Sequence, residues 1–358
     1  MIKLEPLARL VYHLNMAAQN QHYVPKFVLR QFPADSANER VHVYDKHTDR
    51  AFVTSIKNIM AERRFNEFAF ADDYIASFEP VACGAEDQVL PAYRQVVAQR
   101  CLSESPEQKA ALAVFLAFQI LRTKAHRDQW MAMEEETIRV IEESGGRMQD
   151  LQGWENWQPA TEDSLKREHL TSIQSHIGEL AQTIGAKDFL LMEAAPGTSL
   201  YISDNPVVRA NSRDFGLCGN LGLAQEGIEI YMPLSADLLL CAWCPSLLRG
   251  MRGELESAKQ DCRAEGLRKV VQGELNAAGM RDMLDEFASR TRPLEELVTR
   301  AAEGQPGSSI PANMDYYNSL QMSWAYRYVI SRDGDFELAR QLNRENPDLR
   351  RGRRMKAA

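Results

Sequence analysis

The sequence of 358 residues has no apolar run approaching the roughly 18 to 20 residues that a membrane span requires. Its most apolar stretch, residues 110–121, contains Gln119 and is followed at once by Arg122. The N-terminus also lacks the basic region, continuous apolar core and small-residue cleavage site of an export signal. These absences predict a cytoplasmic protein in which the apolar stretch is a buried helix.

The cysteines are few and irregularly spaced, which excludes the disulfide framework of a small secreted protein. Cys241 and Cys244 form a CxxC pair, but no second pair exists and both lie in an apolar, strand-like run. A core role is therefore favoured over a metal or redox role. The sequence also lacks a P-loop, a nucleotide-binding glycine fingerprint, a GxSxG elbow and an HExxH pair, so the common nucleotide-dependent and zinc hydrolase classes are not expected.

The formal charge of −8 argues against a general electrostatic grip on nucleic acid. The exception is the basic tail at residues 350–356, where five cations crowd the C-terminus. Such a tail can touch phosphate but is more often a solubilising end.

The apolar periodicity predicts an α+β protein that is predominantly helical, with helices packed around a small antiparallel sheet and a short N-terminal hairpin. We expect an N-terminal extension at residues 1–19, where Met16 is an alternative start, a single large domain at 20–335, and a C-terminal helix with the basic tail at 336–358. The expected hairpin strands are 41–44 and 51–54, with 64–70 as a possible third strand. The expected helices are 74–99, 105–143, 164–184, 246–302 and 336–343, and residues 314–331 are expected to form a helix or a helix followed by a strand. The expected strands of the sheet are 188–194, 199–203, 228–232 and 237–243.

The first candidate segment for chemistry is His22 to Arg30, where Pro25 suits the first turn of a helix. His22 then precedes the helix and Arg30 lies two turns along it. Both polar groups reach one cavity only if the helix borders that cavity. The alternative is a local hydrogen bond for His22 and a structural ion pair for Arg30.

The second segment is an apolar helix that carries Gln119, Arg122, Thr123 and His126 at spacings of three and four residues, hence on one stripe. A buried guanidinium requires a carboxylate, a phosphate or several carbonyls. The alternative to an anion site is a structural ion pair with Glu79 or Glu86, which precede it in the chain.

The third segment is a strand that runs into Ser203-Asp204-Asn205-Pro206. A carboxylate at a strand end is a usual position for a site residue, and Asp-Asn-Pro is equally a usual turn. Ser203 lacks the glycine-flanked elbow of a serine nucleophile.

The ordered segments HYVPKFVLRQF, QILRT, SDNPV and PLS together resemble a bacterial family catalogued as domain of unknown function 4238. Asn318, Gln321 and Arg327 in YYNSLQMSWAYRYVIS resemble its C-terminal helix. The likeness spans roughly residues 20 to 331. The resemblance implies that the segments form a common site, and it supplies no reaction.

The residue types suit hydrolysis of a phosphodiester or another anionic substrate, as in a nuclease. In this hypothesis His22, Glu86 and Asp204 are catalytic, and Arg30, Gln119, Arg122, Asn205 and Asn318 bind substrate. Glu79, Glu86 and Asp204 would hold a divalent metal ion if one is used. Two alternatives stay open: a non-catalytic module that binds an anionic small molecule, a peptide or nucleic acid, and a purely structural polar network.

Overall fold

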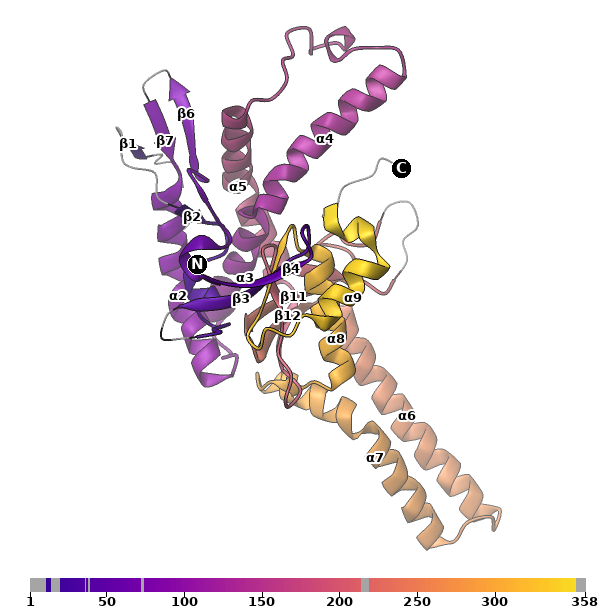
Figure 1. Ribbon diagram of the computed structural model, residues 1–358. Coiled ribbons are helices and arrows are strands. Elements are labelled where there is room, and N and C mark those ends of the chain that lie inside the picture. The colour runs from indigo at the N-terminus through magenta and orange to yellow at the C-terminus, as the bar shows by residue number, and fades with distance from the viewer. Residues whose placement is uncertain are drawn as a thin grey trace.

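The computed structural model describes residues 11–13, 20–35, 37, 39–71, 74–213 and 219–351 (Figure 1). The predicted N-terminal extension lies almost wholly outside these residues, as does most of the basic tail. No helix of the described part is long and apolar enough to cross a membrane. The α-helices are α1 (Lys26–Leu29), α2 (Glu79–Gln99), α3 (Pro106–Leu121), α4 (Lys124–Glu143), α5 (Glu162–Gly185), α6 (Pro245–Val271), α7 (Ala277–Ala302), α8 (Pro311–Trp324) and α9 (Glu337–Glu345).

The described strands form several antiparallel sheets, so the predicted α+β class is confirmed while the single small sheet is not. The largest sheet has the order β10-β11-β12-β8-β13, with only β13 parallel to its neighbour. The strands are β1 (Val11–His13), β2 (Asn20–His22), β3 (Arg40–Asp45), β4 (Arg50–Ser55), β5 (Ala61–Arg63), β6 (Glu67–Ala71), β7 (Tyr74–Ser77), β8 (Asp188–Glu193), β9 (Ile202–Ser203), β10 (Val208–Ala210), β11 (Glu229–Ser235), β12 (Leu238–Trp243), β13 (Gly307–Ser308) and β14 (Tyr328–Ser331).

The N-terminal hairpin is confirmed as β3 and β4, which pair from Arg40↔Ser55 to Asp45↔Arg50. The proposed third strand is wrong, because β6 pairs with β7 instead. The free edge of β3 is taken by β14 from the far end of the chain, with Val329 opposite Tyr44. The hairpin is thereby tied to the C-terminal segment.

β9 also belongs to this second sheet, in the order β4-β3-β14-β9, rather than to the sheet of β8, β11 and β12. Ser203 pairs with Val329, so the residues after β9 lie beside the residues before β14. The expectation that residues 199–203 share a sheet with their sequence neighbours is wrong, because α8 returns β14 to this edge.

The predicted helix at residues 105–143 is two helices. Ser105 caps α3 as expected, and its side chain accepts the Gln108 N–H. α3 ends at Leu121, and Thr123 in an extended conformation caps α4 by accepting the His126 N–H. The sequence pattern missed this break because a threonine N-cap needs no glycine or proline. The break places Arg122 and Lys124 at a helix junction.

The other helices differ from expectation mainly at their ends. Residues 74–77 form β7 before α2 begins, residues 246–302 divide into the hairpin of α6 and α7, and residues 314–331 divide into α8 and β14. In Figure 1 the α6–α7 hairpin projects from the body, and α4 and α5 diverge from it in another direction. The main apolar core lies between α2, α3 and α5 and the sheet of β11 and β12.

Candidate functional site

The three segments singled out in the sequence lie in contact with one another. Gln119 Nε2 donates to the Tyr23 carbonyl at 2.8 Å, and Arg122 Nη2 donates to the His22 carbonyl at 2.6 Å. Thr123 in turn donates to the Asn205 side chain at 3.4 Å. The first segment is thus joined to the second, and the second to the third.

His22 faces the protein interior. Its Nε2 lies 2.9 Å from the Ile56 carbonyl, and the residue is 7% exposed. Burial lowers the pKa of the imidazole, against the effect of this hydrogen bond. A ring nitrogen beside a carbonyl is the donor, so the neutral tautomer carries its proton on Nε2.

Arg122 is buried, and its guanidinium has the carboxylate that burial demands. Nη1 lies 2.5 Å from Glu86 Oε1, and the group stacks over the Phe118 ring at 4.7 Å. Glu79 and Glu86 were the two partners that the sequence offered for Arg122, and Glu86 is the one that pairs with it. Glu79 instead accepts from Asn66 Nδ2 at 2.6 Å, and burial raises its pKa.

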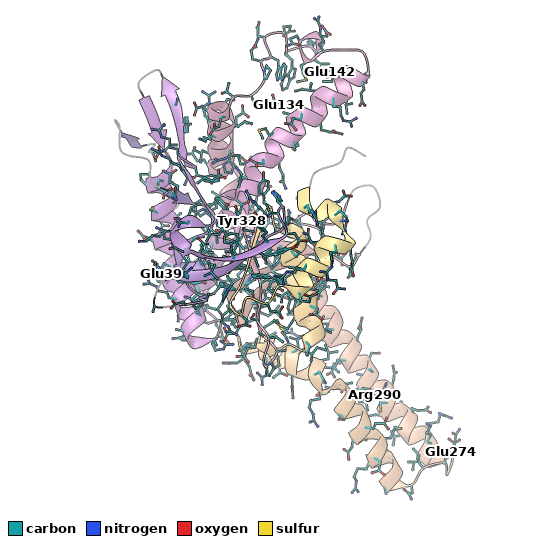
Figure 2. All side chains as sticks on the ribbon, in the orientation of Figure 1. Glu39, Glu134, Glu142, Glu274, Arg290 and Tyr328 are labelled. Carbon is teal, nitrogen blue, oxygen red and sulfur yellow. The ribbon has the colours of Figure 1, made fainter. Side chains whose placement is uncertain are left out.

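Arg30 does not join this group. It is the C-cap of the four-residue α1, and it pairs with Glu39 at 2.7 Å on the surface, where half of its side chain is exposed. Figure 2 shows Glu39 at the edge of the body, well away from Tyr328 at its centre. The placement of Arg30 two turns along a helix is wrong, because α1 is too short.

Asp204 is the most constrained residue of the third segment. Its carboxylate accepts the backbone N–H groups of Tyr326, Arg327 and Tyr328 at 2.7, 2.8 and 2.9 Å. Burial raises its pKa to about 6, against the three N–H groups and the nearby charge of Lys46. The side chain holds residues 326–328 in place.

The predicted amide residues hold backbone in the same way. Asn318 accepts from the Tyr201 N–H and donates to the Ser199 carbonyl, and Gln321 bridges Ser203 and the Pro206 carbonyl. Asn205 Nδ2 donates to the Trp324 carbonyl at 3.1 Å. α8 is thereby fastened to the strand that carries Asp204.

A cavity of about 440 Å³ lies where the segments meet. Of the predicted site residues only Asp204 lines it. The other polar or aromatic side chains of its wall are Tyr23, His47, Asn58, Glu62, Lys124, Tyr326, Arg327 and Tyr328.

The two cations of the cavity wall lie over tyrosine rings. Lys124 Nζ is 5.9 Å from the Tyr326 ring centre and 2.9 Å from Glu62. The Arg327 guanidinium is 4.8 Å from the Tyr328 ring centre and pairs with Asp45 at 2.7 Å. Both cations keep a quarter or more of their side chains exposed, so they can reach a ligand.

Tyr23 is 3% exposed and belongs to this wall. Its N–H donates to Met60 and its carbonyl accepts from Gln119. No hydrogen bond to the hydroxyl occurs within the described residues. Burial and the charges of Asp204 and Glu62 raise its pKa, so the phenol keeps its proton. The cavity wall therefore presents an unpartnered hydroxyl.

The structure brings the three predicted segments together, but most residues that line the cavity are neighbours of those selected from the sequence. Tyr23 follows His22, Lys124 follows Arg122 by two positions, and Arg327 stands in the resembling C-terminal segment. Glu62 had no signal, since it lies in the short strand β5. Within the described residues no group of three or more His, Cys, Asp or Glu side chains is arranged to hold a metal ion.

The fold and this cavity define an α+β protein in which distant segments of one chain enclose a tyrosine-walled site. The chain belongs to the family described as protein of unknown function (DUF4238), whose model matches residues 20–335. The resemblance seen in the sequence is thus confirmed. No curated protein and no solved structure matches the chain.

Proposed function

We propose that the protein binds a small ligand carrying a planar ring and an anionic group in the cavity of Tyr23, Asp204 and Arg327, with nucleoside monophosphates as the class to test. The observation that carries this proposal is the composition of the wall, which combines three tyrosines with two cations. Tyrosine rings stack on planar ligands, and lysine and arginine neutralise phosphate or carboxylate groups.

The unpartnered Tyr23 hydroxyl supports a ligand with its own hydrogen-bonding groups. This hydroxyl donates to no described residue and lines the cavity, so it is available to donate to a ligand acceptor. The volume of about 440 Å³ lies in the range of small-molecule sites.

The charges of the wall favour one anionic group rather than several. Glu62 lines the cavity and pairs with Lys124, and Asp45 pairs with Arg327 without lining the cavity. A single phosphate can draw on both cations while the carboxylates limit the binding of polyanions.

In this proposal His22, Gln119, Arg122, Asn205 and Asn318 are positioning residues. Each donates or accepts a hydrogen bond with backbone or an ion-pair partner that holds a wall segment. Their polar groups are used within the protein, so the ligand is recognised by the side chains next to them.

Hydrolysis of a phosphodiester is the second candidate, and one observation favours it. Asp204 lies on the cavity wall with a pKa of about 6, near the range in which a carboxyl group can transfer protons at neutral pH. A divalent metal ion is part of this candidate, but Glu62 and Asp204 replace the set of Glu79, Glu86 and Asp204 expected from the sequence, because Glu79 and Glu86 do not line the cavity.

The proposal is tested by isothermal titration calorimetry of the purified protein with AMP, CMP, adenosine and inorganic phosphate. We expect the monophosphates to bind more tightly than adenosine or phosphate alone. The Lys124→Gln and Arg327→Gln variants should each weaken AMP binding by about tenfold, or about 1.4 kcal/mol. Arg30→Gln is the matched control, since Arg30 lies on the surface away from the cavity.

Equal binding of AMP by the wild type and both cavity variants would place any AMP site elsewhere and overturn the proposal. The hydrolysis candidate is followed in the same samples with a chromogenic phosphodiester, with and without Mg²⁺ or Mn²⁺. Turnover that Asp204→Asn and Glu62→Gln abolish would favour the enzyme.

A further inference from the structure

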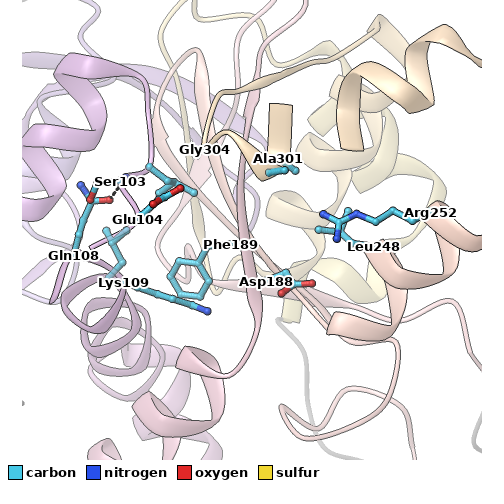
Figure 3. Close-up of a pocket in the computed structure, with 13 residues that line it drawn as sticks. Ser103, Glu104, Gln108, Lys109, Asp188, Phe189, Leu248, Arg252, Ala301 and Gly304 are labelled. Atoms are coloured by element: carbon cyan, nitrogen blue, oxygen red, sulfur yellow. Dashed lines mark hydrogen bonds between the residues drawn. The ribbon is translucent and has the colours of Figure 1, made fainter. Parts of the chain in front are cut away.

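We infer that a second cavity, separate from the tyrosine-walled one, binds a small zwitterion of the α-amino acid class. This cavity of about 270 Å³ lies between the start of α3, the start of β8 and the base of the α6–α7 hairpin (Figure 3). It shares no lining residue with the first cavity.

The apolar part of the wall comes from four elements that are far apart in the sequence. Phe189 lies at the centre in Figure 3, and Leu248 and Ala301 face it from α6 and α7. Leu112 of α3 completes this part. The wall suits an aliphatic or aromatic side chain of a ligand, because burying apolar surface stabilises a complex.

The charged part of the wall contains two cations and two anions. Figure 3 shows Glu104 and Lys109 on the α3 side, and Asp188 and Arg252 on the side of β8 and α6. In the described part of the chain none of the four has an ion-pair partner within 4.0 Å. Lys109 lies over the Phe189 ring, with Nζ 5.5 Å from its centre.

Balanced charges that are not paired with each other recognise a ligand that carries both signs. Each side of the cavity offers one cation and one anion, so a carboxylate can approach Arg252 while an ammonium approaches Asp188, or the two groups can approach Lys109 and Glu104. A purely anionic or purely cationic ligand would meet one repelling pair. The volume admits an amino acid and is small for a larger ligand.

The wall also includes a buried donor without a partner. Gln108 is 6% exposed, and its Oε1 accepts from the Ser103 N–H at 2.8 Å. Its Nε2 has no hydrogen-bond partner among the described residues. The polarity of this wall is therefore not satisfied by the protein alone.

The test is calorimetry of the full chain with L-leucine and L-phenylalanine, alongside N-acetyl-leucine, which lacks the ammonium, and leucinamide, which lacks the carboxylate. We expect a free amino acid to bind and each blocked form to bind about tenfold more weakly. Arg252→Gln and Asp188→Asn should each produce a similar loss. Arg249→Gln on the same helix is the control and should bind as the wild type does.

No heat with either amino acid at about 10 mM, a concentration that detects even millimolar affinity, would overturn the inference. Equal binding of leucine and either blocked form would overturn the claim that the cavity recognises both charged groups of the ligand. If both Arg252→Gln and Asp188→Asn bind the amino acid as tightly as the wild type does, the binding site is not this cavity. The Lys124→Gln variant of the first cavity should leave this binding unchanged, so the two proposals can fail independently.

Discussion

Asp204 Oδ2 accepts the backbone N–H of Arg327 at 2.8 Å across a sequence separation of 123 residues. The same carboxylate accepts the backbone N–H groups of Tyr326 and Tyr328, and these hydrogen bonds fix the backbone conformation of residues 326–328. That conformation directs the Arg327 side chain to the cavity and to Asp45. A turn residue of the third segment therefore shapes a wall built from the C-terminal segment.

Asp204→Asn should lower the free energy of unfolding by about 2 to 4 kcal/mol, because an amide cannot accept three N–H groups with both of its polar atoms. Urea denaturation at neutral pH measures the loss. Asp333→Asn is the control, since Asp333 forms only an exposed ion pair and should change stability by less than about 0.5 kcal/mol. A variant of Asp204 as stable as the control would contradict the positioning role.

Arg122→Ala should cost about 3 to 5 kcal/mol, because it leaves Glu86 without its cation and the His22 carbonyl without its donor. Arg139→Ala removes two ion pairs of similar length on the exposed face of α4. Its cost should stay below about 1 kcal/mol. Chemical denaturation of both variants checks the difference, and equal costs would show that burial does not govern the Arg122 pair.

The sequence could single out three segments that lie in contact because each combines polar groups with apolar surroundings. Arg122 in an apolar helix required a carboxylate, and Glu86 supplies it. The sequence could not distinguish the residues that position the backbone from the residues that line the cavity, because both kinds are polar and stand next to each other in the chain. Whether His22 or Tyr23 faces the cavity depends on the pairing of β2 with β5, which neither strand's pattern fixes.

Long-range strand pairing explains the errors in the fold. β14 occupies the edge of β3 and draws β9 into the same sheet, although β9 is short and close in sequence to another sheet. Local periodicity carries no information on such pairings. The cap signal of Ser105 predicted where α3 begins, whereas the end of α3 at Leu121 was missed.

Gly304→Ala should destabilise the protein by about 3 kcal/mol. Gly304 has a φ of +69°, and an added Cβ would lie 2.1 Å from the Leu102 carbonyl oxygen, which is backbone and cannot move aside cheaply. Gly197 has a φ of +76° with no atom within 4 Å of the added Cβ. Gly197→Ala should cost only about 1 kcal/mol, the cost of the positive φ alone. Thermal unfolding of both variants therefore separates this conformational cost from the additional steric cost at Gly304.

We expect His169 to make the stability of the protein sensitive to acid. Its Nε2 lies 2.6 Å from the Leu121 carbonyl and its Nδ1 accepts from Arg127, so the ring is held neutral. Burial lowers its pKa to about 3, with Arg127 adding to the effect. The unfolded chain takes up a proton near pH 6.5 while the folded protein does not. The stability that this group contributes is therefore full above about pH 6.5 and is lost as the pH falls toward 3.

Between pH 7 and pH 5 this group should account for about 2 kcal/mol of lost unfolding free energy. His169→Gln should reduce the loss by that amount, measured as the difference between urea unfolding curves at the two pH values. A variant with the same pH dependence as the wild type would show that His169 does not titrate on unfolding.

The most direct test of the central claim is a crystal structure of the protein with AMP. The account predicts the ligand in the cavity of Tyr23, Asp204 and Arg327, with its ring against a tyrosine and its phosphate at Lys124 or Arg327. The Tyr23 hydroxyl should then have a hydrogen-bond partner. AMP bound at another surface, with this cavity empty at saturating concentration, would contradict the claim.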